Sequence, residues 1–473
     1  MKRAFVAALP LVVLLAACVP DGIVPQQTEI QPNTLGLGNE PAPKIETGWW
    51  AGLGDPGLNR LMADALAGNP SLGEALARLR AAKAGMEEAN SQLYPHVNFD
   101  ANEQYTRFSN RYIIPPPFGG TFRWFGTIQG DLSWEIDFWG KQAAALDKAK
   151  SLQEAARLDH DAARLAVSGA VVTAYVNLDR AYKLADIAAQ TERDRASTVA
   201  LTKRRVTDGL DSQVEEQEAE ALLAQARQAR VAADSERDIV VHALAALIGR
   251  GADAYKTIGR PSLTLDAALP LPNALPADLL SRRPDVLAAQ ANVDAALSGR
   301  KVAKAAFYPN VDLLATAGWA AIGLGPLFKP ESAQYGGGPA IHLPLFDAGQ
   351  LRADYAGAVA DIDYAVADYN DTVTGAVKET ADALTQIRSI QSQRIEHEHE
   401  LAAAENAFRL AQTRYRTGLS NQITLLDVEN TVFSAREGEV SLAADSAIQR
   451  ITLLVSVGGD FQPPTSTTTT ASR

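Results

Sequence analysis

Two short stretches carry side chains whose type and spacing could support chemistry. The only cysteine of the 473 residues, Cys18, follows Leu-Ala-Ala, and this order looks like a bacterial lipobox, in which the cysteine is lipidated and becomes the mature N-terminus. The run "EHEHE" at 396–400 contains His397 and His399, which lie two residues apart and so on different faces of a helix, unlike the i,i+4 pair of a zinc site. We expect a covalent lipid on Cys18 and a solvated histidine patch.

No stretch of the sequence predicts an enzyme. The chain has no phosphate-binding loop, no nucleophile elbow and no Cys–His cluster, so neither catalysis nor a cofactor other than the lipid is expected. Its formal net charge is -12, and no basic patch interrupts this balance. A nucleic-acid partner is therefore not expected.

The N-terminus has the parts of an export signal. "MKRAFVAALPLVVLLAACVP" places Lys2 and Arg3 before an apolar run that is too short to cross a bilayer as a helix. An ordinary signal peptide with a chance cysteine is the alternative to a lipobox. Val19 follows the cysteine, whereas an Asp there would suggest retention in the inner membrane, so we expect the outer membrane.

The chain contains an internal repeat. One set of residues recurs 214 positions later: Pro70, Gly85, Tyr94, Pro95 and Val97 return as Pro284, Gly299, Tyr308, Pro309 and Val311. A second set recurs 209 positions later: Gly140, Gly209, Leu210 and Gly249 return as Gly349, Gly418, Leu419 and Gly458. A duplicated structural unit explains both sets. The change of offset means that the second copy is five residues shorter somewhere between the positions that correspond to Val97 and Gly140.

Each half also contains a long proline-free window, at 118–260 and at 345–462. Because proline breaks helix interiors, both windows can be helical over long distances. Apolar residues recur in heptads along the second window, at Val359, Val366, Val373, Thr380 and Ile387 and at Ile362, Tyr369, Ala376, Ala383 and Ile390. Sustained heptads predict coiled-coil packing of long helices.

The long helices are expected to turn back at two similar motifs, "TDGLDSQ" (207–213) and "RTGLSNQ" (416–422). Gly209 and Gly418 suit a left-handed helix C-cap. The residues that could cap the following helix are Asp211 or Ser212 in the first turn and Ser420 or Asn421 in the second. Each half is therefore predicted to form an antiparallel helical hairpin.

Between these helices, polar and apolar residues alternate as in strands. Residues 97–106, 122–136 and 311–319 show the pattern clearly, and 335–343 show it more weakly. One apolar and one polar face suit a transmembrane barrel, although a half-buried sheet of a soluble protein also alternates. Four strands cannot close a barrel, so several chains would have to share one. Pro95 and Pro309 mark the helix-to-strand breaks.

At this point the sequence resembles the TolC-like outer membrane factors, especially the lipoprotein branch that serves multidrug efflux pumps. The resemblance is carried by "LPADLLSRRPDVLAAQANVDAA" (275–296), "FYPNV" (307–311), "PLFDAGQLRA" (344–353) and "RYRTGLSNQITLLDVEN" (414–430). It implies a homotrimer with a shared barrel of twelve strands, four from each chain. It also implies a passive duct, opened by a periplasmic adaptor protein and energised by an inner-membrane transporter.

The resemblance further implies a periplasmic gate. Ile423 and Asp427 match positions that form an apolar ring and an Asp ring at the closed tip of related channels, and Tyr415 matches a tyrosine that holds the tip closed in some relatives. Without the resemblance, Asp427 would be a solvated helix residue and Ile423 a packing residue. The heptad position of Tyr415 favours a packing role as much as a gate role. Ser420 stands where some relatives carry an Arg. Adaptors would dock at Gly209, Leu210, Gly418 and Leu419.

The expected fold is mainly α with a small β part: long coiled-coil hairpins that form a periplasmic tunnel, plus four barrel strands per chain. The expected organisation is a signal peptide (1–17), a lipid-anchored segment (18–54), repeat 1 (55–251), an equatorial linker (252–283), repeat 2 (284–459) and a disordered tail (460–473). In repeat 1 the strands fall at about 95–137 and the hairpin at 140–249; in repeat 2 they fall at about 309–344 and 347–457. Two other functions stay open: a duct for type I protein secretion, and a structural coiled-coil envelope lipoprotein.

Overall fold

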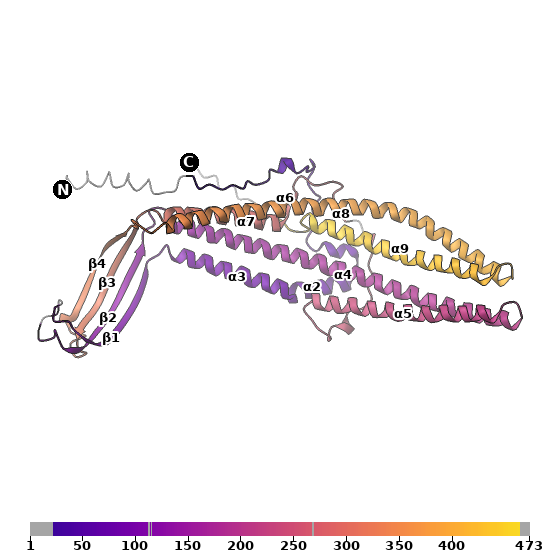
Figure 1. Ribbon diagram of the computed structural model, residues 1–473, viewed down its shortest axis with the longest axis horizontal. Coiled ribbons are helices and arrows are strands. Elements are labelled where there is room, and N and C mark those ends of the chain that lie inside the picture. The colour runs from indigo at the N-terminus through magenta and orange to yellow at the C-terminus, as the bar shows by residue number, and fades with distance from the viewer. Residues whose placement is uncertain (1–21, 112–113, 115, 267–268, 464–473) are drawn as a thin grey trace. The chain divides into compact units, whose positions relative to one another are not determined.

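The computed structural model describes residues 22–111, 114, 116–266 and 269–463, and its main elements follow one order twice (Figure 1). The first copy consists of α3 (Pro70–Ser91), β1 (His96–Arg107), β2 (Phe122–Glu135), α4 (Lys141–Thr207) and α5 (Gln213–Leu247). The second consists of α7 (Pro284–Ala305), β3 (Asn310–Ile322), β4 (Ala333–His342), α8 (Gln350–Arg416) and α9 (Gln422–Ser456). Two further helices, α2 (Pro56–Gly68) and α6 (Leu279–Arg282), precede the copies.

Corresponding helices of the two copies have equal lengths. α3 and α7 both contain 22 residues, α4 and α8 both contain 67, and α5 and α9 both contain 35. The difference between the copies lies in the strands and their connections, since β2 has 14 residues and β4 has 10. The internal repeat predicted from the glycine and proline spacing is therefore confirmed.

Both long helices begin in the same way. An aspartate precedes each helix and accepts hydrogen bonds from amides of its first turn: Asp137 from the amide of Ala143 (2.8 Å), and Asp347 from the amide of Leu351 (2.7 Å). The negative charge also complements the positive end of the helix dipole. Backbone hydrogen bonding of Asp347 lowers the pKa of its carboxyl group. The strands β2 and β4 are thus each followed by a defined helix start.

The predicted heptad residues form the buried side of the long helices. In α8 the buried members are Val359, Ile362, Val366, Tyr369, Val373, Ala376, Thr380, Ala383 and Ile390. α4 shows the same spacing in its buried residues Val167, Val171, Leu178, Ala181, Ala185 and Ala188. The heptad spacing keeps one stripe of each helix against its neighbours, so the coiled-coil prediction holds for the described residues.

The four strands form one antiparallel sheet in the order β1-β2-β3-β4. One row of directly paired residues across the sheet is Val97, Leu132, Ala315 and Gly337, and the next row is Asn98, Asp131, Thr316 and Gly336. Directly paired residues lie on the same face of a sheet, and consecutive residues lie on opposite faces. The sheet therefore has one apolar face and one polar face, as the alternation predicted.

The two outer strands end the sheet. Among the described residues, β1 pairs only with β2 and β4 pairs only with β3. Apolar side chains on this sheet are well exposed, including Val97 at 71 %, Phe99 at 74 % and Tyr335 at 86 %. Two unpaired edges and an uncovered apolar face leave the sheet incomplete within one chain.

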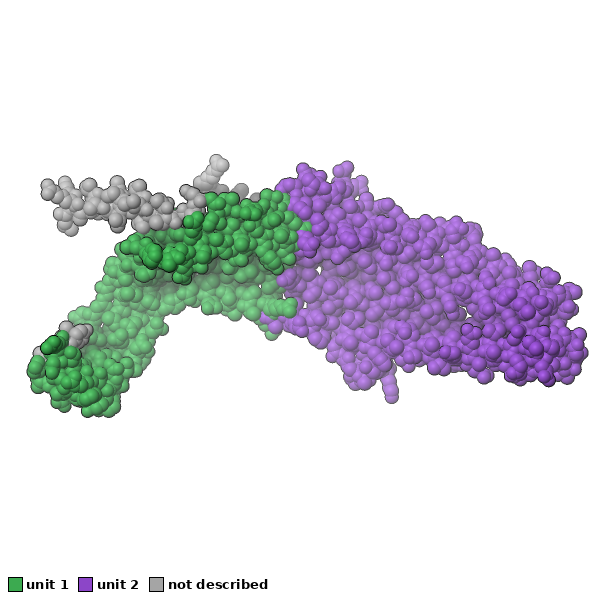
Figure 2. All heavy atoms as spheres, in the orientation of Figure 1, with its two compact units in different colours: residues 1–29, 78–156, 288–370 green, residues 30–77, 157–287, 371–473 purple. Residues whose placement is uncertain are grey.

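The chain forms two compact units, coloured separately in Figure 2. The first contains residues 1–29, 78–156 and 288–370, which include the sheet; the second contains 30–77, 157–287 and 371–473, which include the hairpin turns. The core of the second unit is formed around fully buried Leu58, Val172, Leu244 and Leu454. In the part of the chain that the structure describes, no helix has the length and apolar character needed to cross a membrane.

The predicted boundary of the C-terminal tail needs a correction. Asp460 was expected to begin a disordered tail, yet its side chain is buried and lies 3.5 Å from the guanidinium of Arg164. The residue therefore belongs to the helical unit, because a buried carboxylate needs a cationic partner. Residues 464–473 lie outside the described residues, and so do the predicted signal peptide and Cys18.

Candidate functional site

The two hairpin turns have the same backbone geometry. Gly209 has φ 72° and Gly418 has φ 76°, so both adopt the left-handed conformation that favours glycine. The amide of the following leucine donates to the carbonyl five residues earlier: Leu210 to Arg205, and Leu419 to Arg414, both at 2.8 Å. This Schellman arrangement ends a helix without leaving its last carbonyls unpaired.

The next helix starts within three residues of each turn. Ser212 caps α5: its hydroxyl accepts from the amide of Val214 (3.2 Å), and its own amide donates to Glu215 (2.9 Å). Asn421 caps α9, since its side chain accepts from the amide of Thr424 (3.1 Å). The sequence left two candidates open at each turn, and the structure assigns the cap to the second of them.

The turn leucines are exposed although they are apolar. Leu210 is 64 % exposed and Leu419 is 70 % exposed, and they are the only large side chains among the four turn positions predicted to dock an adaptor. Nothing in the described part of the chain lies within 4 Å of a Cβ built on Gly209 or Gly418. The turns thus present two open apolar points that a partner protein could cover.

Tyr415 lies beside the first turn, although it belongs to the helix of the second hairpin. Its side chain is fully buried, and its hydroxyl donates to the carboxylate of Asp211 at 2.7 Å. The same hydroxyl lies 3.2 Å from the hydroxyl of Thr202 on α4. Tyr415 therefore connects the end of α8 to the α4–α5 turn.

Arg205 completes this contact. Its guanidinium pairs with Asp211 through two hydrogen bonds of 2.8 and 3.0 Å, lies 4.6 Å from the ring centroid of Tyr415, and donates to the Tyr415 carbonyl at 3.1 Å. Bidentate pairing and stacking on an aromatic face both suit the planar guanidinium. We call Arg205, Asp211 and Tyr415 the tip cluster.

The tip cluster shifts the pKa values of its members in a consistent direction. Hydrogen bonding to Arg205 lowers the pKa of Asp211, and hydrogen bonding to Asp211 raises the pKa of Arg205. Burial raises the pKa of Tyr415, and the hydrogen bond to Asp211 adds to this shift. At neutral pH the cluster consists of a carboxylate, a guanidinium and a neutral phenol that donates its proton.

Ile423 and Asp427 lie one turn apart on α9 and both face solvent. Ile423 is 58 % exposed, and Asp427 is exposed as well. Their i,i+4 spacing places both side chains on one face of the helix. An exposed isoleucine beside an exposed carboxylate forms a surface strip that the protein's own core does not use.

A buried ion pair on the opposite face of α9 was missed by the sequence reasoning. Arg195 on α4 donates to Glu429 at 2.6 Å and to Asn430 at 2.6 Å, and both charged side chains are at least 95 % buried. Burial raises the pKa of Glu429 to about 7, against the attraction of Arg195. The available signal was the spacing of Glu429 from Leu425 and Val432, which puts this carboxyl on the apolar side of α9.

The histidine run is only partly as expected. His399 is exposed, but His397 is packed against α9, where its Nε2 lies 2.8 Å from the carbonyl of Ala435 and its Nδ1 lies 3.1 Å from Glu400. The prediction of a solvated patch was therefore wrong for His397, because the adjacent helix covers it at Gly438. Among the described residues, no group of three or more potential metal ligands is arranged to hold a metal ion.

The two prolines lie where helices change to strands. Pro95 separates α3 from β1, and Pro309 separates α7 from β3. Tryptophan side chains hold both junctions: Trp134 donates to the carbonyl of Leu93 (3.0 Å), and Trp139 donates to that of Pro309 (2.8 Å). Indole rings with one polar end suit an apolar surface that meets a wet one.

Comparisons with known proteins give the class to which this architecture belongs. The family model described as "Outer membrane efflux protein" matches residues 61–250 and 275–459. The duplicated hairpins, the four-stranded sheet and this match together define a channel protein of the outer membrane. The chain belongs to the outer membrane efflux protein family, and the resemblance inferred from the sequence is confirmed.

Individual relatives agree with this assignment. The chain is 36 % identical over 367 residues to "Fusaric acid resistance protein FusA" of Burkholderia cepacia, which covers 75 % of this chain and 69 % of the relative. It is 29 % identical over 423 residues to "Multidrug resistance outer membrane protein MdtP" of Escherichia coli, covering 88 % and 86 %. Among solved structures, the outer membrane protein VceC of Vibrio cholerae superposes with a TM-score of 0.83 at 31 % identity, covering 88 % of this chain and all of that one.

Family membership settles the general activity. Members are passive outer-membrane channels for efflux rather than enzymes, and they need no cofactor. They work as trimers together with an adaptor protein and an inner-membrane pump. The chain is accordingly an outer-membrane efflux channel, and the alternative of a purely structural lipoprotein loses its support.

Proposed function

We propose that three copies of this chain place their sheets edge to edge, β1 of one copy beside β4 of the next, and so close one barrel of twelve strands. The unpaired outer edges of β1 and β4 carry this proposal. Open strand edges are not tolerated in lipid, and four strands are too few to enclose a lumen. The trimeric state of the family supplies the number of copies.

In this barrel the apolar face of the sheet contacts lipid and the polar face lines the channel. The row that contains Val97, Leu132 and Ala315 would face outward. The row that contains Asn98 and Asp131 would face the lumen, where Gln129 already donates to Asp131 at 2.9 Å. An apolar exterior with a polar interior is the arrangement of outer-membrane barrels.

A lipid on Cys18 would add a second attachment to the same membrane. The segment that follows this cysteine is held against the sheet-bearing unit: the amides of Gln26 and Gln27 donate to Asp363 at 2.6 and 2.8 Å. Ile23 packs against the cluster of Phe307, Tyr355 and Val359, and Phe307 lies two residues before Pro309 at the helix-to-strand break of the second copy. Residues 23–27 thus lie on the unit that carries the strands, which supports a lipid anchor at Cys18 beside the barrel.

The hairpin turns would form the periplasmic end of the duct, with Ile423 and Asp427 of three copies facing its axis. Their exposure on one face of α9 supports this role, since one chain alone gives them no partner in the described residues. Three carboxylates at one axis repel each other and attract cations. The tip cluster holds α8 against the first turn, and adaptor binding at Leu210 and Leu419 would release that hold.

The exported compounds would be small organic molecules. Relatives are named for multidrug resistance and for fusaric acid resistance, which favours small-molecule cargo over secreted proteins. The lipobox inferred at Cys18 also favours the efflux branch. Which pump delivers the cargo would be set by the adaptor that recognises the turns.

Electron microscopy of the detergent-purified full-length protein tests the shared barrel directly. We expect a three-fold particle with a continuous lumen. A monomer, or a rod without a lumen, would overturn the proposal, because the β1 and β4 edges would then have to be covered in another way. A particle of different symmetry would refute the count of twelve strands.

A further inference from the structure

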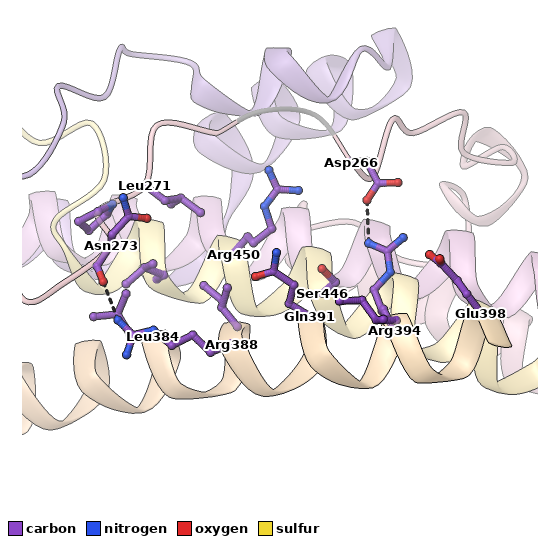
Figure 3. Close-up of a pocket in the computed structure, with 14 residues that line it drawn as sticks. Asp266, Leu271, Asn273, Leu384, Arg388, Gln391, Arg394, Glu398, Ser446 and Arg450 are labelled. Carbon is purple, nitrogen blue, oxygen red and sulfur yellow. Dashed lines mark hydrogen bonds and ion pairs between the residues drawn. The ribbon is translucent and has the colours of Figure 1, made fainter. Parts of the chain in front are cut away.

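A pocket of about 600 Å³ lies in the second unit, between α8, α9 and the loop before α6 (Figure 3). Its volume falls in the range of small-molecule sites. Three of its side chains are arginines, Arg388 and Arg394 from α8 and Arg450 from α9. We call it the arginine pocket.

The loop holds each guanidinium in place. Arg388 donates to the carbonyl of Asn273 at 2.8 Å, Arg450 donates to that of Leu265 at 3.1 Å, and Arg394 pairs with Asp266 at 3.0 Å. These contacts fix the direction of the side chains, so their cationic groups line the pocket without having to be ordered by a ligand.

The pocket carries more positive than negative charge. Its lining includes three arginines but only two carboxylates, Asp266 and Glu398. Burial lowers the pKa of Arg450; the positive charge of Arg394 acts in the same direction, while Asp266 opposes it. Cations crowded in a partly buried site are stabilised by an added anion.

Apolar side chains also line the arginine pocket. Leu384 and Ile387 from α8 and Leu453 from α9 line it beside the arginines, and Leu271 of the loop lies opposite (Figure 3). A site with an apolar wall and a few oriented charged groups discriminates by both shape and charge. An inorganic anion alone would leave this wall without a contact.

We propose that the arginine pocket binds a small organic anion, with a carboxylate or phosphate group on Arg388, Arg394 and Arg450 and an apolar body against Leu384, Ile387 and Leu453. Guanidinium groups form charge-assisted, often bidentate hydrogen bonds with both kinds of oxyanion. The site is separate from the hairpin turns and the proposed gate, so the ligand would act on the channel rather than block it. The proposal does not depend on the gate assignment.

Isothermal titration calorimetry on the full-length protein in lipid nanodiscs tests the proposal with three probes: benzoate, phenyl phosphate and the neutral benzyl alcohol. We expect benzoate and phenyl phosphate to bind saturably, at one site per protomer, with affinity that falls as salt is added. Benzyl alcohol is expected to bind at least tenfold more weakly, because it has no charged oxygen to accept the charge-assisted hydrogen bonds of the arginines. The relative affinities of benzoate and phenyl phosphate show whether the pocket prefers a carboxylate or a phosphate group.

Variants locate the binding. Arg388→Gln should weaken both anions about tenfold, and the double variant Arg388→Gln with Arg394→Gln should abolish saturable binding. Arg436→Gln is the matched control, because Arg436 lies on α9 outside the pocket and pairs with Glu405 at the surface. Unchanged single-channel conductance would show that a variant is folded. No saturable binding to the wild type, or equal binding to the double variant, would overturn the proposal.

Discussion

At the scale of single residues, the hydroxyl of Tyr415 connects the two hairpins by donating one hydrogen bond to Asp211. Tyr415→Phe keeps the ring under Arg205 but removes the donor to Asp211, at 2.7 Å. We expect a stability loss of about 1 kcal/mol, the usual net worth of one hydrogen bond. We also expect a larger single-channel conductance in planar bilayers, because the end of α8 is less firmly held.

The control for this substitution is Tyr364→Phe. Tyr364 also lies on α8 but is 75 % exposed, so its hydroxyl has water as an alternative partner. Its removal should change neither the apparent Tm nor the conductance. Equal conductance of the wild type and Tyr415→Phe would separate the tip cluster from gating and leave it a packing contact.

Asp427 offers a second test at this scale. Asp427→Ala should raise conductance and reduce block by multivalent cations, because three symmetric carboxylates would no longer narrow the axis or bind cations. Asp427→Asn keeps the size of the side chain and removes only its charge, so it separates the effect of the narrowed axis from the effect of the carboxylate charge. If both variants conduct and respond to cations like the wild type, Asp427 is a solvated helix residue.

At the scale of elements, the left-handed glycine of the second turn can be compared with a glycine inside a helix. Gly418 has φ 76°, and no described atom lies within 4 Å of an added Cβ, so Gly418→Ala meets strain only in the backbone. This strain should lower stability by about 1 kcal/mol. Gly375→Ala, inside α8 and equally open, should instead raise stability by up to about 1 kcal/mol.

Apparent Tm values of the two alanine variants check this pair. Opposite shifts are expected, since the same atom is added at both positions. A destabilised Gly375→Ala would indicate that helix packing in the trimer, rather than backbone conformation, sets the cost. An unaffected Gly418→Ala would mean that the turn can relax out of the Schellman geometry.

The buried pair between α4 and α9 predicts a pH dependence. Burial raises the pKa of Glu429 to about 7 from its ordinary 4.5, so between these values the folded state holds a proton that the unfolded state has released. The stabilising effect of this proton is complete below pH 4.5 and is lost as the pH rises through 7. The slope within this window is at most about 1.4 kcal/mol per pH unit.

Chemical denaturation of the wild type and Glu429→Gln across pH 5 to 8 measures this contribution (a window of roughly three pH units around the shifted pKa). Glutamine does not titrate, so the advantage of the wild type over the variant should shrink as pH rises. A constant difference between the two proteins would contradict the raised pKa.

The same helices and strands show which features could be predicted from the sequence and which could not. Proline-free windows, heptads and alternation are local patterns, so they predicted the helices, the strands and the turns. The contact of Tyr415 with Asp211 spans 204 residues, and that of Arg195 with Glu429 spans 234. Such pairs depend on how α4, α8 and α9 pack, and one sequence carries no periodic signal for them. For the same reason His397 could not be distinguished from His399.

At the scale of the whole molecule, two attachments to the membrane are proposed, and they can be separated. Cys18→Ala, exported behind a signal peptide without a lipobox, removes only the lipid. The protein should stay in the outer-membrane fraction, because the apolar face of the sheet still contacts lipid. Adding Ala101→Asp, on that apolar face, should release it or prevent its assembly, whereas Asn102→Asp, on the polar face of the same strand, should not. Recovery of the Cys18→Ala protein as a soluble periplasmic monomer would mean that the lipid alone holds the chain, and that the unpaired edges of β1 and β4 are closed by something other than neighbouring copies.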